Sequence, residues 1–320
     1  MKIRKIIVGG GAGYIGSALV PELVKDGYDV TVVDLLWFGN YLPKGVRLIR
    51  KDLLKMTHNE LQQYDCLIFL AGISNDPMAH FNPRLNFQYN AALPAYLAFE
   101  AKKAGIKRYI YGSSCSIYGN TTRLCTESMT PGTVEPYGIS KLQGEIGVMQ
   151  NQSKDFSTII LRQGTVCGYS PRMRFDLVIN AMIKSSLTEG KIIVNNALIW
   201  RPICSIQDVV QAYKLSISAP AKINGIFNIA SGNYQVGTIA KRAQLLLEKK
   251  LHKKITIVYK KEKILRNYKV SLVKSKTQLG YKPNITLDMM INNIIDNIPS
   301  SVQFSDKKYY NIETFKHIPL

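Results

Sequence analysis

Three residues whose side chains can move a proton are spaced for a common site in this 320-residue chain. Tyr137 and Lys141 are four residues apart, which places them on one face of a helix, and Ser114 lies 23 residues before the tyrosine. A nearby ammonium favours the phenolate, so we expect the phenol to act as a base near neutral pH. The serine hydroxyl would hold a substrate oxygen against it. The set predicts hydride and proton exchange at a carbinol carbon.

The spacing alone is weak evidence, because it recurs at Tyr259 and Lys263 with no serine segment before it. A glycine-rich loop near the start of the chain strengthens the first occurrence. Gly10, Gly13 and Gly16 have the spacing of a dinucleotide-binding turn, and they follow an expected strand and open an expected helix. Glycine permits close backbone approach, and a helix N-terminus attracts a pyrophosphate. The loop therefore predicts a dinucleotide beside the proton-transfer residues.

The type of dinucleotide is indicated by Asp34, which ends the second expected strand about 20 residues after the loop. A carboxylate there accepts hydrogen bonds from the adenosine ribose and repels a 2′-phosphate. No arginine follows in residues 35–38, so NAD is favoured over NADP. A glycine-rich turn also occurs in flavin and nucleotide-triphosphate proteins, but no Gly-Lys-Ser/Thr follows this loop.

Short apolar runs alternate with helical segments through the first half of the chain, the pattern of a parallel sheet wrapped by helices. The expected strands are Ile3–Val8, Asp29–Val33, Arg47–Ile49, Cys66–Leu70, Arg108–Tyr111 and Ser157–Leu161. The expected helices are Ile15–Lys25, Phe87–Ala104 and Tyr137–Gln150. These elements predict an α/β fold with a Rossmann-type, doubly wound parallel sheet.

After Gly168 the alternation loosens, which predicts a smaller C-terminal lobe. The expected elements there are a helix at about 176–187, strand Ile192–Val194, helix Asp208–Ser216, strand Ile226–Ile229 and helix Thr238–Lys249. We assign residues 1–168 and about 203–233 to a dinucleotide-binding domain, and residues 169–202 and 234–297 to the smaller lobe. Residues 298–320 form a polar, weakly patterned tail that we expect to be mobile.

Composition narrows the class of protein further. The chain is 46% hydrophobic, enough for a large core, yet no apolar run reaches the roughly 18 residues of a membrane span. The apolar N-terminus runs straight into glycines, which indicates a first strand rather than a signal peptide and a cytoplasmic location. Five scattered cysteines fit neither a disulfide framework nor a metal site. The net charge of +20 admits nucleic-acid binding, but the basic residues are spread along the chain, so we expect no nucleic-acid partner.

Taken in order, these segments resemble the extended short-chain dehydrogenase/reductases, specifically the nucleotide-sugar epimerase/dehydratase group. The resemblance covers about residues 1–295. It rests on the glycine loop, Asp34, Arg50-Lys51-Asp52-Leu53, Leu70-Ala71-Gly72, Asn90, Ser113-Ser114-Cys115-Ser116-Ile117-Tyr118-Gly119, Tyr137 with Lys141, Arg201 before Asp208-Val209, and Arg266-Asn267-Tyr268.

The resemblance implies NAD as the cofactor and a homodimer formed by the helices at 87–104 and 137–150. The implied cofactor-binding residues are Gly10, Gly13, Tyr14, Ile15, Gly16, Asp34, Asp52, Leu53, Leu70, Ala71, Gly72, Asn90, Tyr137 and Lys141. Within this set Asp52 and Leu53 would contact the adenine, and Asn90 would help to order the site. Ser114 would be the catalytic hydroxyl, Tyr137 would transfer the proton, and Lys141 would hold the nicotinamide ribose.

The segment after the catalytic serine separates the reactions of this group. The 4,6-dehydratases carry Asp-Glu or a single Glu there as acid and base, whereas this chain has Cys115 and Ser116. The enzymes that make GDP-fucose place a cysteine directly before Ile-Tyr and pair it with a histidine, and this chain has Ser116 in that place. What remains is 4-epimerisation, or net oxidation or ketoreduction, at C4. A dehydratase and a non-catalytic NAD-binding scaffold are the alternatives.

The substrate implied by the resemblance is a nucleotide-diphosphate sugar, UDP-, GDP-, dTDP- or CDP-linked. Arg172 and Arg174 lie in a segment similar to one of a bacterial NAD-dependent GDP-heptose 4-dehydrogenase, and Arg201 and Arg266 are similar to the family's diphosphate-binding arginines. Surface ion pairs are the alternative role for all four. Thr165 replaces an asparagine of many UDP-sugar epimerases, which leaves the base open. Two further candidates would either bind sugar hydroxyls or form a turn: Ser74 and Asn75.

Overall fold

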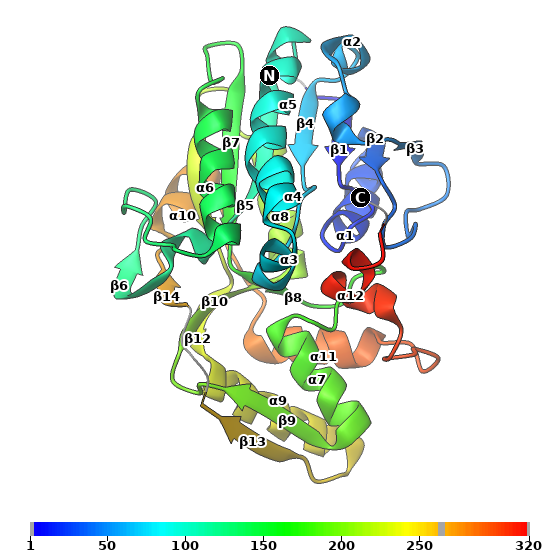
Figure 1. The fold of residues 1–320 in the computed structure, drawn as a ribbon, viewed down its shortest axis with the longest axis vertical. Coiled ribbons are helices and arrows are strands. Elements are labelled where there is room, and N and C mark those ends of the chain that lie inside the picture. Colours follow the sequence, from blue (N-terminus) through cyan, green and yellow to red (C-terminus); the bar gives the residue numbers. More distant parts are fainter. Residues whose placement is uncertain (1–2, 262–265, 319–320) are drawn as a thin grey trace.

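The computed structural model describes residues 3–261 and 266–318, and a seven-stranded parallel sheet dominates it (Figure 1). Its strand order is β11-β7-β5-β4-β1-β2-β3. The strands are β1 (Lys5–Gly9), β2 (Asp29–Asp34), β3 (Arg47–Arg50), β4 (Cys66–Phe69), β5 (Arg108–Ser114), β7 (Ser157–Gln163) and β11 (Gly225–Ile229). Neighbouring strands all run parallel. The predicted α/β fold with a Rossmann-type sheet is confirmed.

Helices cover both faces of this sheet, which is why its strands are nearly continuous apolar runs. On one face lie α1 (Gly16–Lys25) and α8 (Ile206–Ser218), and on the other lie α5 (Leu93–Lys103) and α6 (Pro136–Met149). Figure 1 shows α5 and α6 side by side. A buried apolar cluster fills each of the two interfaces between sheet and helices.

A smaller lobe lies beyond the carboxyl ends of the strands (Figure 1). It contains α7 (Val178–Glu189), β9 (Lys191–Asn195), α9 (Val236–Leu251), β13 (Thr256–Lys260) and α11 (Leu287–Asn297) around a core of their own. Between the lobes lies a three-stranded sheet of β8 (Thr165–Cys167), β10 (Trp200–Ser205) and β12 (Gly232–Gln235). The chain passes between the lobes several times, so neither lobe is a continuous segment.

Short elements complete the described chain. They are η1 (Leu53–Lys55), α2 (His58–Leu61), α3 (Asp76–Phe81), α4 (Pro83–Phe87), η2 (Gln88–Ala92), η3 (Cys115–Tyr118), β6 (Asn120–Cys125), β14 (Asn267–Val270), α10 (Val273–Leu279), η4 (Lys307–Tyr309) and α12 (Asn311–Phe315). The helix predicted at 87–104 differs, since a π-helical turn at 88–92 precedes α5. Pro94 has no N–H to donate to the preceding turn, which favours such a widened turn before it.

The tail differs from the expected mobile segment. Residues 304–318, which we name the C-terminal strap, contain η4 and α12 and pack against both lobes. Phe315 is fully buried, and its ring lies 5.8 Å from that of Trp37. Phe304 and Tyr309 both pack on the ring of Phe175 at the smaller lobe, at 5.0 and 5.1 Å between ring centroids. Scattered aromatic residues therefore anchor a segment whose overall composition is polar.

The cysteine thiols are buried and unreactive in this fold. All five are buried and unbridged. Burial raises the pKa of the Cys66 thiol to about 12, which keeps it protonated and a poor nucleophile. Across the described ranges no helix is long and apolar enough to cross a membrane.

Candidate functional site

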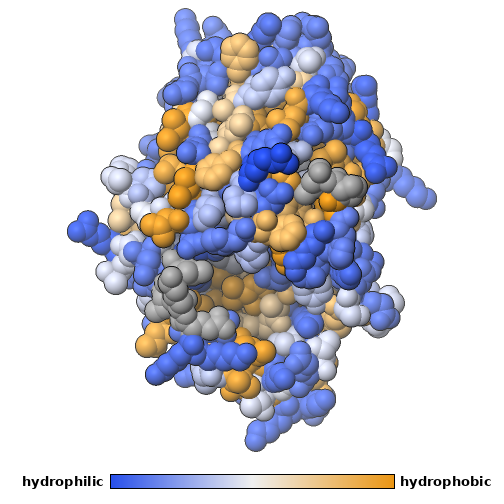
Figure 2. Space-filling model, in the orientation of Figure 1, coloured by the Kyte–Doolittle hydropathy of each residue, from blue (hydrophilic) through white to orange (hydrophobic). Residues whose placement is uncertain are grey.

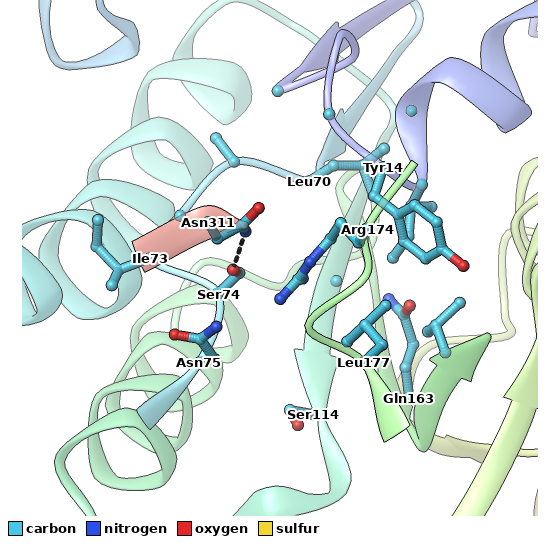
Figure 3. Close-up of a pocket in the computed structure, with 18 of the residues that line it drawn as sticks. Tyr14, Leu70, Ile73, Ser74, Asn75, Ser114, Gln163, Arg174, Leu177 and Asn311 are labelled. Atoms are coloured by element: carbon cyan, nitrogen blue, oxygen red, sulfur yellow. Dashed lines mark hydrogen bonds between the residues drawn. The ribbon is translucent and has the colours of Figure 1, made fainter. Parts of the chain in front are cut away.

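A cavity of about 530 Å³ lies at the carboxyl ends of β1, β2, β4 and β5, where the smaller lobe faces the sheet. In doubly wound folds this edge is where ligands bind. The surface is hollowed between the two lobes in Figure 2. In Figure 3, Ser74 and Asn311 face Arg174 and Tyr14 across the cavity, and Ser114 lies at the end of its strand below them.

The glycine loop forms one wall of the cavity, between β1 and α1. Gly10 has a φ of +77°, and a Cβ there would lie 2.5 Å from the backbone nitrogen of Ala71. A Cβ on Gly16 would lie 2.3 Å from the carbonyl oxygen of Gly11. Both contacts are with backbone atoms, so no larger residue fits without moving the loop. The open amide face of this turn suits a pyrophosphate.

Asp34 stands beside the loop at the end of β2. One carboxylate oxygen accepts from the amide of Ala12 at 3.0 Å and the other from the amide of Leu36 at 2.8 Å. Burial raises the pKa of this carboxyl, while these backbone bonds and the charge of Arg172 oppose the rise. The carboxylate is thereby held at the cavity wall, in the place predicted for a ribose contact.

Other members of the predicted cofactor set fall into two groups. Gly13, Ile15, Leu53, Leu70, Ala71 and Gly72 line the cavity with backbone or apolar atoms. Tyr14 also lines it, but its hydroxyl donates to the carbonyl oxygen of Gly168 at 2.6 Å, which joins the loop to the smaller lobe. The second group, Asp52 and Asn90, does not line the cavity.

Both of these last residues support the wall from behind. Asp52 caps the turn η1 through the amide of Leu54 at 3.0 Å and accepts from the hydroxyl of Tyr89 at 2.9 Å. Asn90 donates to the carbonyl oxygen of Ile73 at 2.8 Å and is fully buried. The predicted adenine contact of Asp52 stays a prediction, and its carboxylate is already engaged by Leu54 and Tyr89. Asn90 fits its predicted role in ordering the site.

The three proton-transfer candidates line the same cavity. Ser114 ends β5, while Tyr137 and Lys141 lie one turn apart at the start of α6. The Lys141 ammonium nitrogen donates to the carbonyl oxygen of Gly112 at 2.9 Å, which ties the helix to β5. The competing pair does not form such a site in the described chain, since Tyr259 is 54% exposed and Lys263 lies outside the described residues.

The acidity of the phenol differs from the expectation. Burial and then the Asp76 carboxylate raise the pKa of Tyr137, while its hydrogen bond with Ser114 and the charges of Arg266 and Arg174 act in the opposite direction. Burial also lowers the pKa of Lys141 to about 7. The lysine is thus about half protonated at neutral pH, and its charge is not the main influence on the pKa of Tyr137. The physical reason is that both groups lie beneath the surface, which sequence spacing does not reveal.

This lysine predicts a pH-dependent stability. Between pH 7 and 10.5 the unfolded chain binds a proton on Lys141 that the folded chain does not, so the free energy of unfolding rises with pH in that window. We expect Lys141→Met to be more stable than the wild type at pH 7, without added ligand. The difference should shrink by up to about 1.4 kcal/mol per pH unit toward pH 9. Urea unfolding at pH 7, 8 and 9 measures it, and a difference that is constant with pH contradicts the assignment.

The four predicted arginines all line the cavity, but the structure separates them. Arg174 makes two hydrogen bonds to Asp176, at 2.9 and 2.8 Å, and Arg266 forms an ion pair with Asp76. Arg201 donates to the carbonyl oxygen of Arg266. These contacts are partly buried in the cavity wall rather than on the open surface.

Arg172 lies near Arg174, and it also approaches Asp34 and the strap. Its guanidinium stacks 4.0 Å from the ring centre of Phe38 and donates to the side-chain oxygen of Asn311 at 2.5 Å. Burial lowers its pKa to about 9. Arg172 was predicted to bind the sugar substrate, and that role stays a prediction.

Ser74 and Asn75 line the cavity, and the turn role predicted for them is seen at Asn75, while sugar binding stays a prediction. Asn75 caps α3 through the amide of Met78 at 3.0 Å, which is a turn function, and its amide nitrogen donates to Asp176 at 3.2 Å inside the cavity. Ser74 accepts from Asn311 at 2.5 Å. Thr165, on β8, also lines the cavity.

Several cavity residues were not predicted. Asp76 directly follows Asn75 and Asp176 stands two residues after Arg174, so a search for carboxylates beside the predicted residues would have found both. No sequence signal marks Asn311 and Ile312, which reach the cavity only because the strap folds back. The lining residues that the sequence did not predict include Trp37, Phe38, Asp76, Gln163, Asp176, Asn311 and Ile312.

Known proteins resemble this chain in sequence. Residues 6–230 match the NAD dependent epimerase/dehydratase family. An uncharacterized UDP-glucose epimerase of Bacillus subtilis (strain 168) is 28% identical over 321 residues, 93% of this chain and 99% of the relative. A UDP-glucose 4-epimerase of Neisseria meningitidis serogroup C is 32% identical over 178 residues, 50% of this chain and 52% of the relative.

Solved structures share the fold. A UDP-glucuronic acid 4-epimerase from Bacillus cereus, in complex with UDP-glucuronic acid and NAD, superposes with a TM-score of 0.80 at 24% identity, covering 91% of this chain and 98% of the other. An NAD-dependent NDP-hexosamine 5,6-dehydratase of tunicamycin biosynthesis superposes with a TM-score of 0.81 at 23% identity, covering 92% and 97%. The shared fold therefore does not distinguish an epimerase from a dehydratase. The sequence match decides the family: this chain belongs to the NAD dependent epimerase/dehydratase family, whose cofactor is NAD.

Proposed function

We propose that this protein is an NAD-dependent 4-epimerase of a nucleotide-diphosphate sugar. The observation that carries the proposal is the convergence of Ser114, Tyr137 and Lys141 on one cavity that is continuous with the glycine loop. NAD, when bound, supplies an acceptor for the C4 hydride and returns it. UDP-sugars are the first substrates to test, because the names of several relatives carry UDP.

The chain's own residues have separate tasks in this proposal. Tyr137 takes the proton of the C4 hydroxyl and returns it after the sugar has inverted, and Ser114 hydrogen-bonds the same oxygen. Because the pKa of Tyr137 is raised, the free site keeps the phenol protonated, and we expect the base to form only once ligands have bound. Lys141, fixed to Gly112, holds the nicotinamide ribose. Arg201 binds the diphosphate, and Arg266, which is paired with Asp76, assists it from the neighbouring segment.

Two observations favour epimerisation over the alternatives. Cys115 and Ser116 are buried and do not line the cavity, so the positions that hold acid and base in 4,6-dehydratases offer neither here. The strap adds Asn311 and Ile312 to the cavity wall, where Asn311 bonds Arg172. A wall that helps to retain the dinucleotide suits an epimerase, which regenerates its cofactor in place, whereas a net dehydrogenase must release it in every turnover.

The test is to purify the protein, identify any retained dinucleotide, and incubate it with a panel of UDP-, GDP-, dTDP- and CDP-sugars. Retained NAD, an inverted sugar and no accumulating NADH support the proposal. NADH formed in proportion to oxidised sugar would assign a 4-dehydrogenase instead. A 4-keto-6-deoxy product would assign a dehydratase, and no reaction with any sugar would favour a non-catalytic scaffold.

We propose further that two copies associate through α5 and α6. Phe99 on α5 is 56% exposed and Ile146 on α6 is 47% exposed, and the two helices lie side by side on the surface. A second copy would cover these apolar side chains.

The expected particle in light scattering is two chains for the wild type and one for Phe99→Glu/Ile146→Glu. Leu198→Glu, at a 78% exposed position of the smaller lobe, is the matched control and should leave two chains. A wild-type particle with the mass of one chain would contradict the proposed dimer.

A further inference from the structure

Two carboxylates lie in the part of the cavity around Ser114 and Tyr137, which we name the sugar end. Asp76 begins α3 and is buried, and its charge raises the pKa of Tyr137, which places it close to the phenol. Asp176, on the segment before α7, accepts from Asn75 at 3.2 Å. Neither residue has a role in the proton transfer described above.

The two carboxylates neutralise the arginines nearest to them. Arg174 makes two hydrogen bonds to Asp176, at 2.9 and 2.8 Å, and Arg266 is ion-paired with Asp76. By contrast, Arg201 donates to the carbonyl oxygens of Trp200 and Arg266 and has no carboxylate hydrogen-bonded to it among the described residues. An anionic group of the ligand is therefore attracted more strongly to Arg201 than to the paired Arg174 and Arg266.

One oxygen of Asp76 has no partner. Its Oδ2 faces Arg266, while Oδ1 is buried and lacks a hydrogen bond. A buried carboxylate oxygen without a donor is unfavourable, so a ligand that brings a donor gains affinity, and a ligand that brings a second anion loses it. Sugar hydroxyls are donors, and the carboxylate of a uronic acid is an anion.

Resting on the proposed function, we infer that Asp76 is a specificity-determining residue that accepts a hydrogen bond from a hydroxyl of a neutral hexose and excludes uronic acids. Asp176 supports this selection because its ion pair with Arg174 makes that guanidinium less available to a carboxylate of the ligand. The inferred substrate class is thus a nucleotide-linked neutral sugar, in contrast to the UDP-glucuronic acid bound by the Bacillus cereus protein of the same fold.

The test compares two matched pairs that differ only at C6, UDP-glucose with UDP-glucuronic acid and GDP-mannose with GDP-mannuronic acid. We expect the wild type to prefer the neutral member of the accepted pair by at least about tenfold in kcat/KM. Asp76→Asn should raise KM for the neutral sugar by about 10- to 100-fold, the range of a hydrogen bond to a charged group. Because the lost charge no longer raises the pKa of Tyr137, the pH profile of kcat should shift to lower pH. It should also reduce the discrimination against the uronic acid.

Controls separate this inference from the proposed function. Asp288→Asn also removes an Asp–Arg ion pair, with Arg242 on the surface of the smaller lobe, and should leave both constants unchanged. Equal use of neutral and uronic sugars by the wild type overturns the inference and leaves the proposed function standing. A fall in kcat at constant KM in Asp76→Asn also overturns it, because the carboxylate would then act in the reaction. No turnover of any sugar overturns both.

Discussion

Tyr137→Phe should lower kcat by about 10²- to 10⁴-fold, the usual contribution of a positioned acid–base group, and leave the content of bound dinucleotide unchanged. The phenyl ring keeps the packing of the buried side chain and removes only the hydroxyl that bonds Ser114. Turnover of the accepted sugar and the absorbance of the retained cofactor measure the two quantities.

The matched control for this variant is Tyr259→Phe, which removes the hydroxyl from the other Tyr-x-x-x-Lys sequence. It lies on β13 in the smaller lobe and should leave kcat within about twofold of the wild type, because exposed substitutions away from a site have small effects. Unchanged turnover in Tyr137→Phe would remove this residue from the mechanism.

Glu145→Ala should destabilise the fold by about 3–5 kcal/mol, because it leaves a buried guanidinium without its counter-charge. Glu145 is fully buried on α6, accepts from the hydroxyl of Ser113 at 2.5 Å, and is ion-paired with Arg162 of β7 at 2.7 Å. Glu145 therefore joins the helix that carries Tyr137 to β5, which carries Ser114, and to the neighbouring β7. Urea unfolding measures the loss.

The double variant Glu145→Ala/Arg162→Met distinguishes the ion pair from simple loss of packing. Replacing both charges with apolar groups is often close to neutral, so we expect the double variant to recover most of the stability lost in the single one. A double variant as unstable as the sum of its parts would show that the ion pair is not the cause.

The sequence predicted what depends on local pattern. The strands and most helices followed from apolar periodicity, and the glycine loop followed from spacing in a strand–turn–helix context. Ser114, Tyr137 and Lys141 were brought together as expected because each sits at the end or start of a regular element facing one edge of the sheet.

What the sequence could not predict depends on contacts between distant residues. The pKa direction of Tyr137 follows from burial by both lobes, and the position of Arg172 follows from its approach to Asp34. The engagement of Asp52 by Tyr89 likewise joins residues 37 positions apart. The packing of the strap was not predicted, because its few aromatic residues stand among polar neighbours and form no helical or strand periodicity.

The strap also has a consequence for the order in which the protein matures. Asn311 and Ile312 leave the ribosome after every other residue of the cavity wall, since they stand last among them in the sequence. The glycine loop and its neighbouring strands are therefore synthesised while their cover is still missing. We expect a nascent chain to take up its dinucleotide through this open side, and the docking of Phe315 beside Trp37 to seal it in afterwards.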